Sequence, residues 1–306
     1  MALDRFSLKL RQNMSLEDKI RFTQRRITEW VEYFGVNGCY ISFSGGKDST
    51  VLLHLVRELY PEIEAVFVDT GLEYPEIRKF VKSFENVTIL RPEMRFDKVL
   101  EKYGYPIISK EVSECIDGAR KALKYNDGRY QYRLDKLNGL KKSHNRTKWK
   151  FLLDAPFKIS NQCCNIMKKR PSHKFYKNTG KTPIIGTMAE ESDLRTSQYL
   201  KNGCNGFNLK IPTSTPIAFW TEQDILEYID KYKIPIASVY GDVIKTDKYH
   251  TTGCQRTGCM FCGYGCHREK NPNRFQKLKI THPKQYDYII NVLGMGKVLD
   301  FIGVDY

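Results

Sequence analysis

Short apolar runs alternate with helical apolar stripes through the first 90 residues of the chain. The runs that predict buried strands lie at residues 39–43, 63–68 and 87–90. The stripes that predict amphipathic helices lie at residues 15–34, 51–59 and 75–84. Strands that alternate with helices favour a parallel, doubly wound α/β sheet, in which ligands lie beyond the carboxyl ends of the strands.

The regular alternation is interrupted in the middle of the chain. Residues 104–160 mix Gly, Asn, Lys, Arg and Tyr, which predicts helices joined by flexible basic loops, inserted at the rim of the sheet. A strand at 182–185 and a helix that ends near Tyr232 then resume the pattern. We therefore expect an α/β domain over residues 1–240, with this insertion, and a cysteine-rich C-terminal segment over residues 241–306.

The first predicted strand runs into a glycine-rich turn directly before a helix. The residues of this turn are Ser44, Gly45, Gly46, Lys47, Asp48 and Ser49. Adjacent glycines let the backbone approach a ligand with its N–H groups, and the helix dipole adds positive potential at the same place, so the turn suits a phosphate. Lys47 can supply a charge and both serines can supply hydroxyl donors, while Asp48 either caps the helix or helps to hold Mg²⁺.

This turn lacks the Walker A spacing. It resembles the SGGxDS signature of the PP-loop ATP pyrophosphatases, which cleave ATP between the α and β phosphates and have the adenine nucleotide alpha hydrolase-like fold. An ordinary glycine turn is the alternative, although all five fixed positions match in a strand–helix setting. Asp69, at the end of the second strand, is expected to face the same nucleotide and to contact its ribose or Mg²⁺; a turn-forming Asp-Thr-Gly is the alternative.

The net charge of +15 is concentrated in one part of the chain. Residues 1–100 carry 15 basic and 15 acidic side chains, whereas residues 101–180 carry 19 basic and 7 acidic ones. This local excess favours a nucleic-acid-binding surface over a merely solvated one. Tyr130, Tyr132 and Trp149 lie among these charges and suit base stacking, or they form the core of the insertion.

The composition also bears on cellular location. No apolar run approaches the roughly 18–20 residues that a membrane span needs, and the first residues do not resemble a signal peptide. We therefore expect a soluble cytoplasmic protein with no membrane partner. Nine cysteines in such a chain indicate metal or redox chemistry before disulfides.

Three motifs in the second half of the chain resemble one family. A Cys-Cys pair is followed nearly one hundred residues later by Cys-x-x-Cys, similar to the [4Fe–4S] pattern of adenylyl-sulfate reductases. The stretch Gly-Thr-Met-Ala-Glu-Glu-Ser-x-x-Arg resembles the nucleotide-binding loop of that family, and Pro-Ile-x-x-Trp-Thr also matches. The chain thus resembles the phosphoadenosine-phosphosulfate (PAPS) reductase family over roughly residues 38–266.

The resemblance implies roles for particular residues. The cluster ligands would be Cys163, Cys164, Cys259 and Cys262. Gly186 and Arg195 would lie near the nucleotide. A four-thiolate Zn²⁺ site is the alternative, and it would be drawn from Cys254, Cys259, Cys262 and Cys266. With a cluster, Cys254 and Cys266 are spare or alternative ligands. The cysteines expected to be buried are Cys39, Cys115 and Cys204.

Two departures from the reductases affect the predicted activity. The chain has no cysteine after Cys266, where reductases carry a catalytic thiol, and its glycine turn is intact, whereas that of reductases is usually degraded. The combination most resembles the ATP pyrophosphatase subunit of DNA phosphorothioation systems, which works with a cysteine desulfurase. It implies an ATP- and Mg²⁺-dependent iron–sulfur sulfurtransferase that binds nucleic acid, DNA or RNA, through residues 101–180.

Two alternatives remain open. The first is a sulfonucleotide reductase, acting on adenylyl sulfate or its 3′-phosphate, in which Cys254 or Cys266 replaces the missing thiol. The second is a non-catalytic sensor that binds a nucleotide and a partner. The sequence names neither the substrate nor the sulfur donor.

Overall fold

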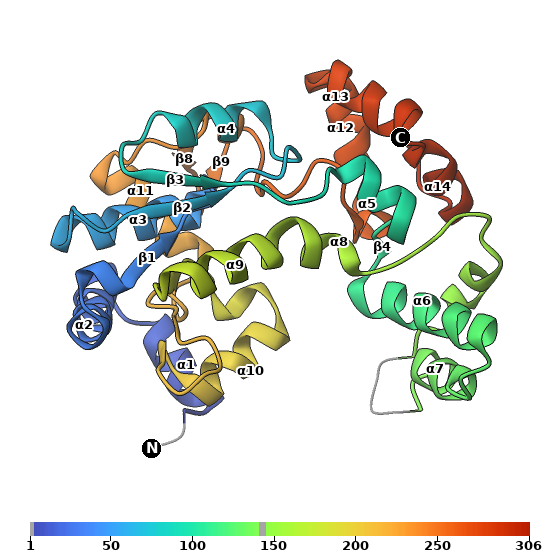
Figure 1. Ribbon diagram of the computed structural model, residues 1–306. Helices are drawn as coiled ribbons and strands as arrows, with labels where there is room; N and C mark the ends of the chain where they lie inside the picture. Colours follow the sequence, from blue (N-terminus) through green and yellow to red (C-terminus); the bar gives the residue numbers. More distant parts are fainter. Residues whose placement is uncertain (1–2, 141–144) are drawn as a thin grey trace. The chain divides into compact units, whose positions relative to one another are not determined.

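The computed structural model describes residues 3–140 and 145–306 (Figure 1). Residues 141–144, which are part of the basic insertion, lie outside the described residues. The chain divides into two compact units whose segments interleave along the sequence. Unit 1 comprises Met1–Asp69, Glu73–Leu90 and Ser172–Thr257, and unit 2 comprises Thr70–Leu72, Arg91–Pro171 and Gly258–Tyr306. The domain boundary expected at residue 240 stays a prediction, because compactness does not show which part folds alone.

Unit 1 is built on a six-stranded sheet with the order β3-β2-β1-β5-β7-β6. Its strands are β1 (Cys39–Ser42), β2 (Ala65–Val68), β3 (Val87–Leu90), β5 (Thr182–Ile185), β6 (Asn205–Gly206) and β7 (Thr213–Ser214). All neighbouring pairs are parallel except β6 and β7. The mostly parallel sheet confirms the predicted α/β class.

Helices and one small ribbon complete unit 1. The helices are α1 (Arg5–Gln12), α2 (Leu16–Phe34), α3 (Lys47–Leu59), α4 (Pro75–Lys82), α10 (Asp193–Asn202) and α11 (Glu222–Tyr232), with most of α9 (Arg170–Thr179). The antiparallel ribbon is formed by β8 (Val243–Lys245) and β9 (Tyr249–Thr251). Helix α3 packs against both α2 and α11. Its apolar stripe is buried, as the spacing predicts, at Val51, Leu52, Leu55 and Val56, whereas Leu59, the last residue of the helix, is 37% exposed.

Unit 2 joins the insertion to the cysteine-rich segment. Its elements are α5 (Phe96–Tyr103), β4 (Ile107–Ile108), α6 (Lys110–Tyr125), α7 (Tyr130–Leu137), α8 (Gln162–Cys164), β10 (Gly263–Tyr264), α12 (Arg274–Thr281), α13 (Pro283–Asp287) and α14 (Met295–Ile302). Strand β10 pairs in parallel with β4, so the two distant segments share one small sheet. The helices predicted in the insertion are present.

Arg120 shows that part of the basic charge of the insertion serves the fold. Its guanidinium donates hydrogen bonds to four backbone carbonyls that follow α7 in the chain. The accepting residues are Leu152, Leu153, Ala155 and Phe157. Since a guanidinium in this position satisfies backbone acceptors, it is not available to a partner.

None of the helices in the described part of the chain combines the length and the apolar character that crossing a membrane requires.

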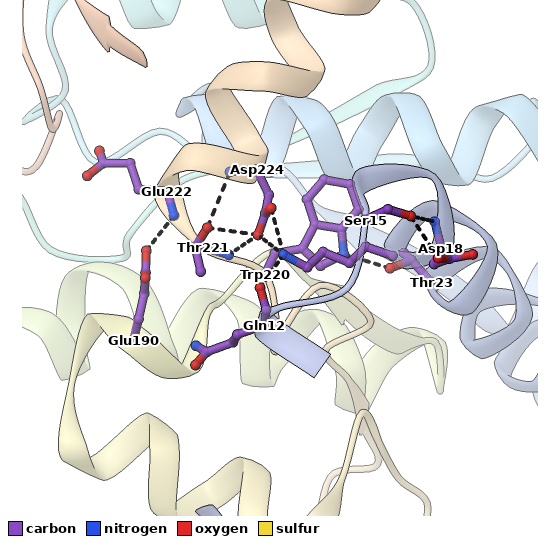
Figure 2. A network of polar contacts seen from close by, with 10 residues as sticks. Gln12, Ser15, Asp18, Thr23, Glu190, Trp220, Thr221, Glu222 and Asp224 are labelled. Carbon is purple, nitrogen blue, oxygen red and sulfur yellow. Dashed lines mark hydrogen bonds and ion pairs between the residues drawn. The ribbon is translucent and has the colours of Figure 1, made fainter. Parts of the chain in front are cut away.

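A buried ion pair connects α2 to the start of α11 (Figure 2). Lys19 is only 2% exposed, and its Nζ donates to both oxygens of Asp224 at 2.6 and 2.7 Å and to the carbonyl of Gln12 at 2.7 Å. Asp224 also accepts from the backbone N–H of Thr221 at 2.6 Å, and the Thr221 side chain accepts from the N–H of Asp224, which completes a capping box. The pair therefore fixes where α11 begins.

We expect Lys19→Met to lower the free energy of unfolding by about 3–5 kcal/mol, because the carboxylate of Asp224 would stay buried without its cation. Lys9→Met, on the exposed side of α1, is the matched control and should change stability by less than about 0.5 kcal/mol. Urea unfolding of both variants measures the difference. Equal transition midpoints would show that the buried pair contributes nothing net.

Candidate functional site

The glycine turn between β1 and α3 is organised by its own hydroxyl groups. The Oγ atoms of Ser44 and Ser49 lie 3.0 Å apart, and Ser49 Oγ donates to the carbonyl of Gly46 at 2.9 Å. The N–H of Gly46 donates to Ser44 Oγ at 3.3 Å. The two serines thus hold the turn in shape at the N-terminus of α3, where a phosphate is favoured.

Three glycines let backbone segments approach this turn closely. Gly45 has φ +71°, and a Cβ there would lie 2.7 and 2.9 Å from methyl groups of Val81 and Ile77 on α4. Gly46 is the N-cap of α3 and makes no side-chain cap. A Cβ at Gly186, directly after β5, would lie 3.1 Å from the carbonyl oxygen of Asp48. Gly186 therefore lies against the first turn of α3, beside the predicted phosphate site.

Lys47 is buried and its charge is already paired. It is 4% exposed; its Nζ forms an ion pair with Glu222 and donates to the carbonyl of Gln255 at 2.9 Å. Glu222 is the first residue of α11, and its backbone N–H donates to Glu190 Oε1 at 2.5 Å. Figure 2 shows Glu190 and Glu222 beside the capping network of α11. Sequence reasoning missed Glu222, although it directly follows the Trp-Thr motif.

Asp48 does not cap α3, so that interpretation is wrong. The helix begins at Lys47 with Gly46 as its cap, and the Asp48 side chain therefore lies within the first turn. Its Oδ1 is buried and has no hydrogen-bond partner among the described residues. Burial raises the pKa of Asp48, and the positive charges of Lys47, Arg256 and Arg195 oppose this rise. One carboxylate oxygen is thus available to a ligand, as a role in holding Mg²⁺ requires.

Two arginines share the electrostatic environment of the turn. Arg195, on α10, forms an ion pair with Glu191, and burial lowers its pKa, with Arg256 lowering it further. Arg195 also lines a cavity of about 270 Å³ in unit 1, together with Thr187 and Gln198. Lys47, Arg195 and Arg256 therefore give the turn three cations. Arg256 was not predicted, since it lies among the cysteines of the C-terminal segment.

Asp69 lies at the carboxyl edge of the sheet, directly after β2. Its Oδ2 accepts a hydrogen bond from Arg78 Nη2, on α4, at 2.9 Å. Ser44 follows the neighbouring parallel strand β1, so both residues lie at the same edge, as predicted. The contact of Asp69 with a ribose or Mg²⁺ stays a prediction.

Unit 2 contains the four cysteines that the resemblance assigns to a cluster. Cys163 and Cys164 lie on α8, and Cys259 and Cys262 precede β10. Burial raises the pKa of Cys163, and Cys164, Cys259 and Cys262 raise it further, which places all four groups within electrostatic range of one another. Burial also raises the pKa of Cys262 to about 11. Four thiolates held this closely repel each other unless a metal centre compensates their charge.

This donor set fits an iron–sulfur cluster, since soft thiolates are its usual ligands. Among the described residues, no three His, Cys, Asp or Glu side chains are arranged to hold a single metal ion. Cys254 belongs to unit 1, and Cys266 is buried with its Sγ donating to the carbonyl of Gly263 at 3.1 Å. The expected burial of the remaining three is confirmed at Cys39, Cys115 and Cys204.

Comparison with known proteins identifies relatives of the chain. The phosphoadenosine phosphosulfate reductase domain family matches residues 38–263. An uncharacterized protein of Methanocaldococcus jannaschii is 24% identical over 257 residues, which cover 82% of this chain and 46% of the relative. The adenosine 5′-phosphosulfate reductase of Staphylococcus haemolyticus is 24% identical over 233 residues, covering 74% of this chain and 73% of the reductase. The chain thus spans about half the length of the first of these relatives.

One of the similar solved structures contains an iron–sulfur cluster. It is the U34-tRNA thiolase NcsA of Methanococcus maripaludis with its [4Fe–4S] cluster. Its sequence is 16% identical to this chain and the TM-score is 0.38, over 91% of this chain and 80% of the thiolase.

We expect Gly45→Ala to lower the free energy of unfolding by more than the unfavourable positive φ of an alanine alone would. The added methyl meets Val81 and Ile77 as well as the unfavourable φ, so the loss of unfolding free energy should exceed that of Gly180→Ala by roughly 1–3 kcal/mol. Gly180 is the matched control because it has φ +71° and nothing within 4 Å of its would-be Cβ. Urea unfolding measures both, and equal losses would contradict the close packing of the turn on α4.

Proposed function

The chain belongs to the phosphoadenosine phosphosulfate reductase family, and we propose that it is an ATP-dependent sulfurtransferase that cleaves ATP to AMP and pyrophosphate. The relatives that carry a functional name are enzymes, among them an adenosine 5′-phosphosulfate reductase. Membership of the family does not specify the reaction. The proposal specifies ATP as the nucleotide, AMP and pyrophosphate as the products, and nucleic acid as the acceptor of sulfur.

The main support for the proposal is the glycine turn, with its intact motif and the cations around it. All its positions are intact, and Lys47, Arg195 and Arg256 supply three cations where the helix N-terminus already favours an anion. A sulfonucleotide has no β,γ-diphosphate to occupy such a site. ATP has one, and the same cations stabilise the pyrophosphate as it leaves.

In the proposed reaction an oxygen of the acceptor attacks the α-phosphorus of ATP and displaces pyrophosphate. The N–H groups of the turn bind the phosphates, and Lys47 exchanges its carboxylate partner, Glu222, for a phosphate oxygen. The buried Oδ1 of Asp48 is available as a ligand of the Mg²⁺ that accompanies ATP. A sulfur nucleophile then displaces AMP from the adenylated acceptor, which leaves sulfur in place of oxygen.

The sulfur-carrying centre is proposed to lie in unit 2. Cys163, Cys164, Cys259 and Cys262 would hold a [4Fe–4S] cluster, which when bound supplies iron to carry the sulfur. The sulfur would come from a cysteine desulfurase or another donor. The excess of basic residues in 101–180 supports a nucleic acid, DNA or RNA, as the acceptor.

A second candidate function is reduction of a sulfonucleotide, which the family and the named reductase favour. The two functions differ in their products. ATP cleavage releases AMP and pyrophosphate, whereas the reductase releases sulfite from adenylyl sulfate in the presence of a thiol reductant. Testing one anaerobic preparation for both products separates them, and nucleotide binding without either product would indicate a sensor.

We expect Lys47→Ala to abolish AMP formation and Glu222→Gln to bind pyrophosphate about five- to tenfold more tightly than the wild type. The first variant loses the cation that contacts the phosphates, and the second loses the carboxylate that competes for it. Radiolabelled ATP and titration calorimetry measure the two effects. Glu85→Gln, on the exposed surface of unit 1, is the matched control. AMP formation by Lys47→Ala at the wild-type rate would refute the assignment.

We expect anaerobically purified protein to contain iron and to absorb broadly in the visible range, and Cys262→Ser to lose both. Cys254→Ser and Cys115→Ser should retain them, because neither cysteine belongs to the proposed ligand set. Metal analysis with absorption spectroscopy is the measurement. Stoichiometric zinc without iron, lost in Cys254→Ser, would instead identify the zinc site.

A further inference from the structure

A small surface of unit 2 combines aromatic rings with cations beside the cysteine-rich segment. It includes part of the 3-10 helix η2 (Thr147–Asp154) and part of η6 (Cys266–Arg268). The residues of this Trp149 surface are Lys148, Trp149, Lys150, Phe151, His267 and Arg268. The rings of Trp149 and His267 meet edge to face, with centroids 4.8 Å apart and planes at 77°. His267 is five residues from Cys262 in sequence, and the surface belongs to the same compact unit as the four cysteines.

The cations of the Trp149 surface lie close to its aromatic rings and form no ion pairs with carboxylates in the described part of the chain. Lys148 Nζ lies 5.1 Å from the centre of the Trp149 ring. Burial lowers the pKa of His267, and the positive charges of Arg268 and Lys148 lower it further, so both cations lie near that ring. Within residues 3–140 and 145–306, no ion pair joins a carboxylate to Lys148, Lys150 or Arg268. These three cations therefore have no carboxylate within ion-pair distance in the described part of the chain.

Several other cations of the basic segment are already engaged by carboxylates or by backbone carbonyls. The described ion pairs are Lys121–Asp117, Arg129–Asp127, Arg133–Glu114, Lys136–Glu114 and Arg146–Glu111. Arg120 is used by backbone carbonyls. An ion-paired side chain has to give up its carboxylate before it contacts a phosphate. The unpaired cations of the Trp149 surface are therefore better placed to bind a polyanion than these engaged cations.

The accessible aromatic rings favour single-stranded nucleic acid over a duplex as the ligand of this surface. Trp149 is half-buried and Phe151 is 41% exposed, so both rings keep accessible area. In a duplex the faces of the bases are covered by stacking, and binding relies on phosphates and groove edges. Unpaired bases expose their faces and stack on aromatic side chains, with nearby cations contacting the backbone.

We propose that the Trp149 surface binds single-stranded nucleic acid, with an unpaired base stacked on Trp149 and the flanking phosphates contacted by Lys148, Lys150 and Arg268. This deepens the proposed function by naming the substrate class and rests on it for the role of the bound strand. The base next to the stacked one would then lie near the four cysteines, where sulfur is to be delivered.

The test uses the anaerobically purified full chain and fluorescein-labelled oligonucleotides of one sequence, as single-stranded DNA, single-stranded RNA and duplex DNA. Fluorescence anisotropy at several salt concentrations gives affinities and salt slopes. We expect Trp149→Ala to weaken single-strand binding about 5- to 150-fold, with Trp149→Phe losing less and duplex binding unchanged. Lys148→Gln with Lys150→Gln should lower the single-strand salt slope by about 1.4, because each neutralised phosphate contributes about 0.7.

Tyr125→Ala is the matched control, since Tyr125 is an aromatic residue of the same unit that is 68% exposed on α6. It should bind like the wild type. The proposal is overturned by an equal loss in Tyr125→Ala, by unchanged binding in Trp149→Ala, by preference for the duplex, or by no binding to any oligonucleotide. AMP formation by the same preparations tests the glycine turn separately. AMP formation together with Trp149-independent binding overturns this inference alone.

Discussion

A lysine and an aspartate buried together fix the geometry on which the candidate site of unit 1 depends. Lys19 and Asp224 are 205 residues apart in sequence, and their pairing holds α2 against the first turn of α11. A buried charge without its partner is strongly unfavourable, so this contact admits few alternative arrangements. Asp224 also completes the capping box that fixes the start of the helix. Two residues earlier in the chain, Glu222 forms an ion pair with Lys47, in the glycine turn.

The charged groups around the glycine turn lie at or beside the first turns of helices. Asp48 is held inside the first turn of α3, where it has lost water without gaining a hydrogen bond in the described part of the chain. Glu190 accepts from the backbone at the start of α11. The site is thus held together by contacts between helix N-termini. Such N-termini prefer anions, which explains why carboxylates lie beside them.

Local patterns in the sequence predicted the strands, the turn and the buried cysteines, because each depends on residues close together in the chain. The four strands expected from apolar runs are present, and Thr182–Ile185 matches its prediction residue for residue. Contacts over long sequence separations were not predictable. Lys47 and Glu222 are 175 residues apart, and neither segment contains a sequence signal that indicates its contact with the other. The capping role given to Asp48 failed because helix-start preferences do not reveal which residue becomes buried. Composition found the basic segment, but it could not show which cations are paired.

The pairing of β4 with β10 has a consequence for biosynthesis. The two strands are separated by 156 residues, from Ile107 to Gly263. At a translation rate of about 5–20 residues per second, the first strand waits roughly 8–30 s for its partner. During that interval Cys163 and Cys164 have emerged from the ribosome without the segment that carries the other two thiols. Contacts of such high sequence separation also form slowly. The nascent chain therefore passes through a stage in which the thiols of Cys163 and Cys164 are exposed before the rest of unit 2 has been made.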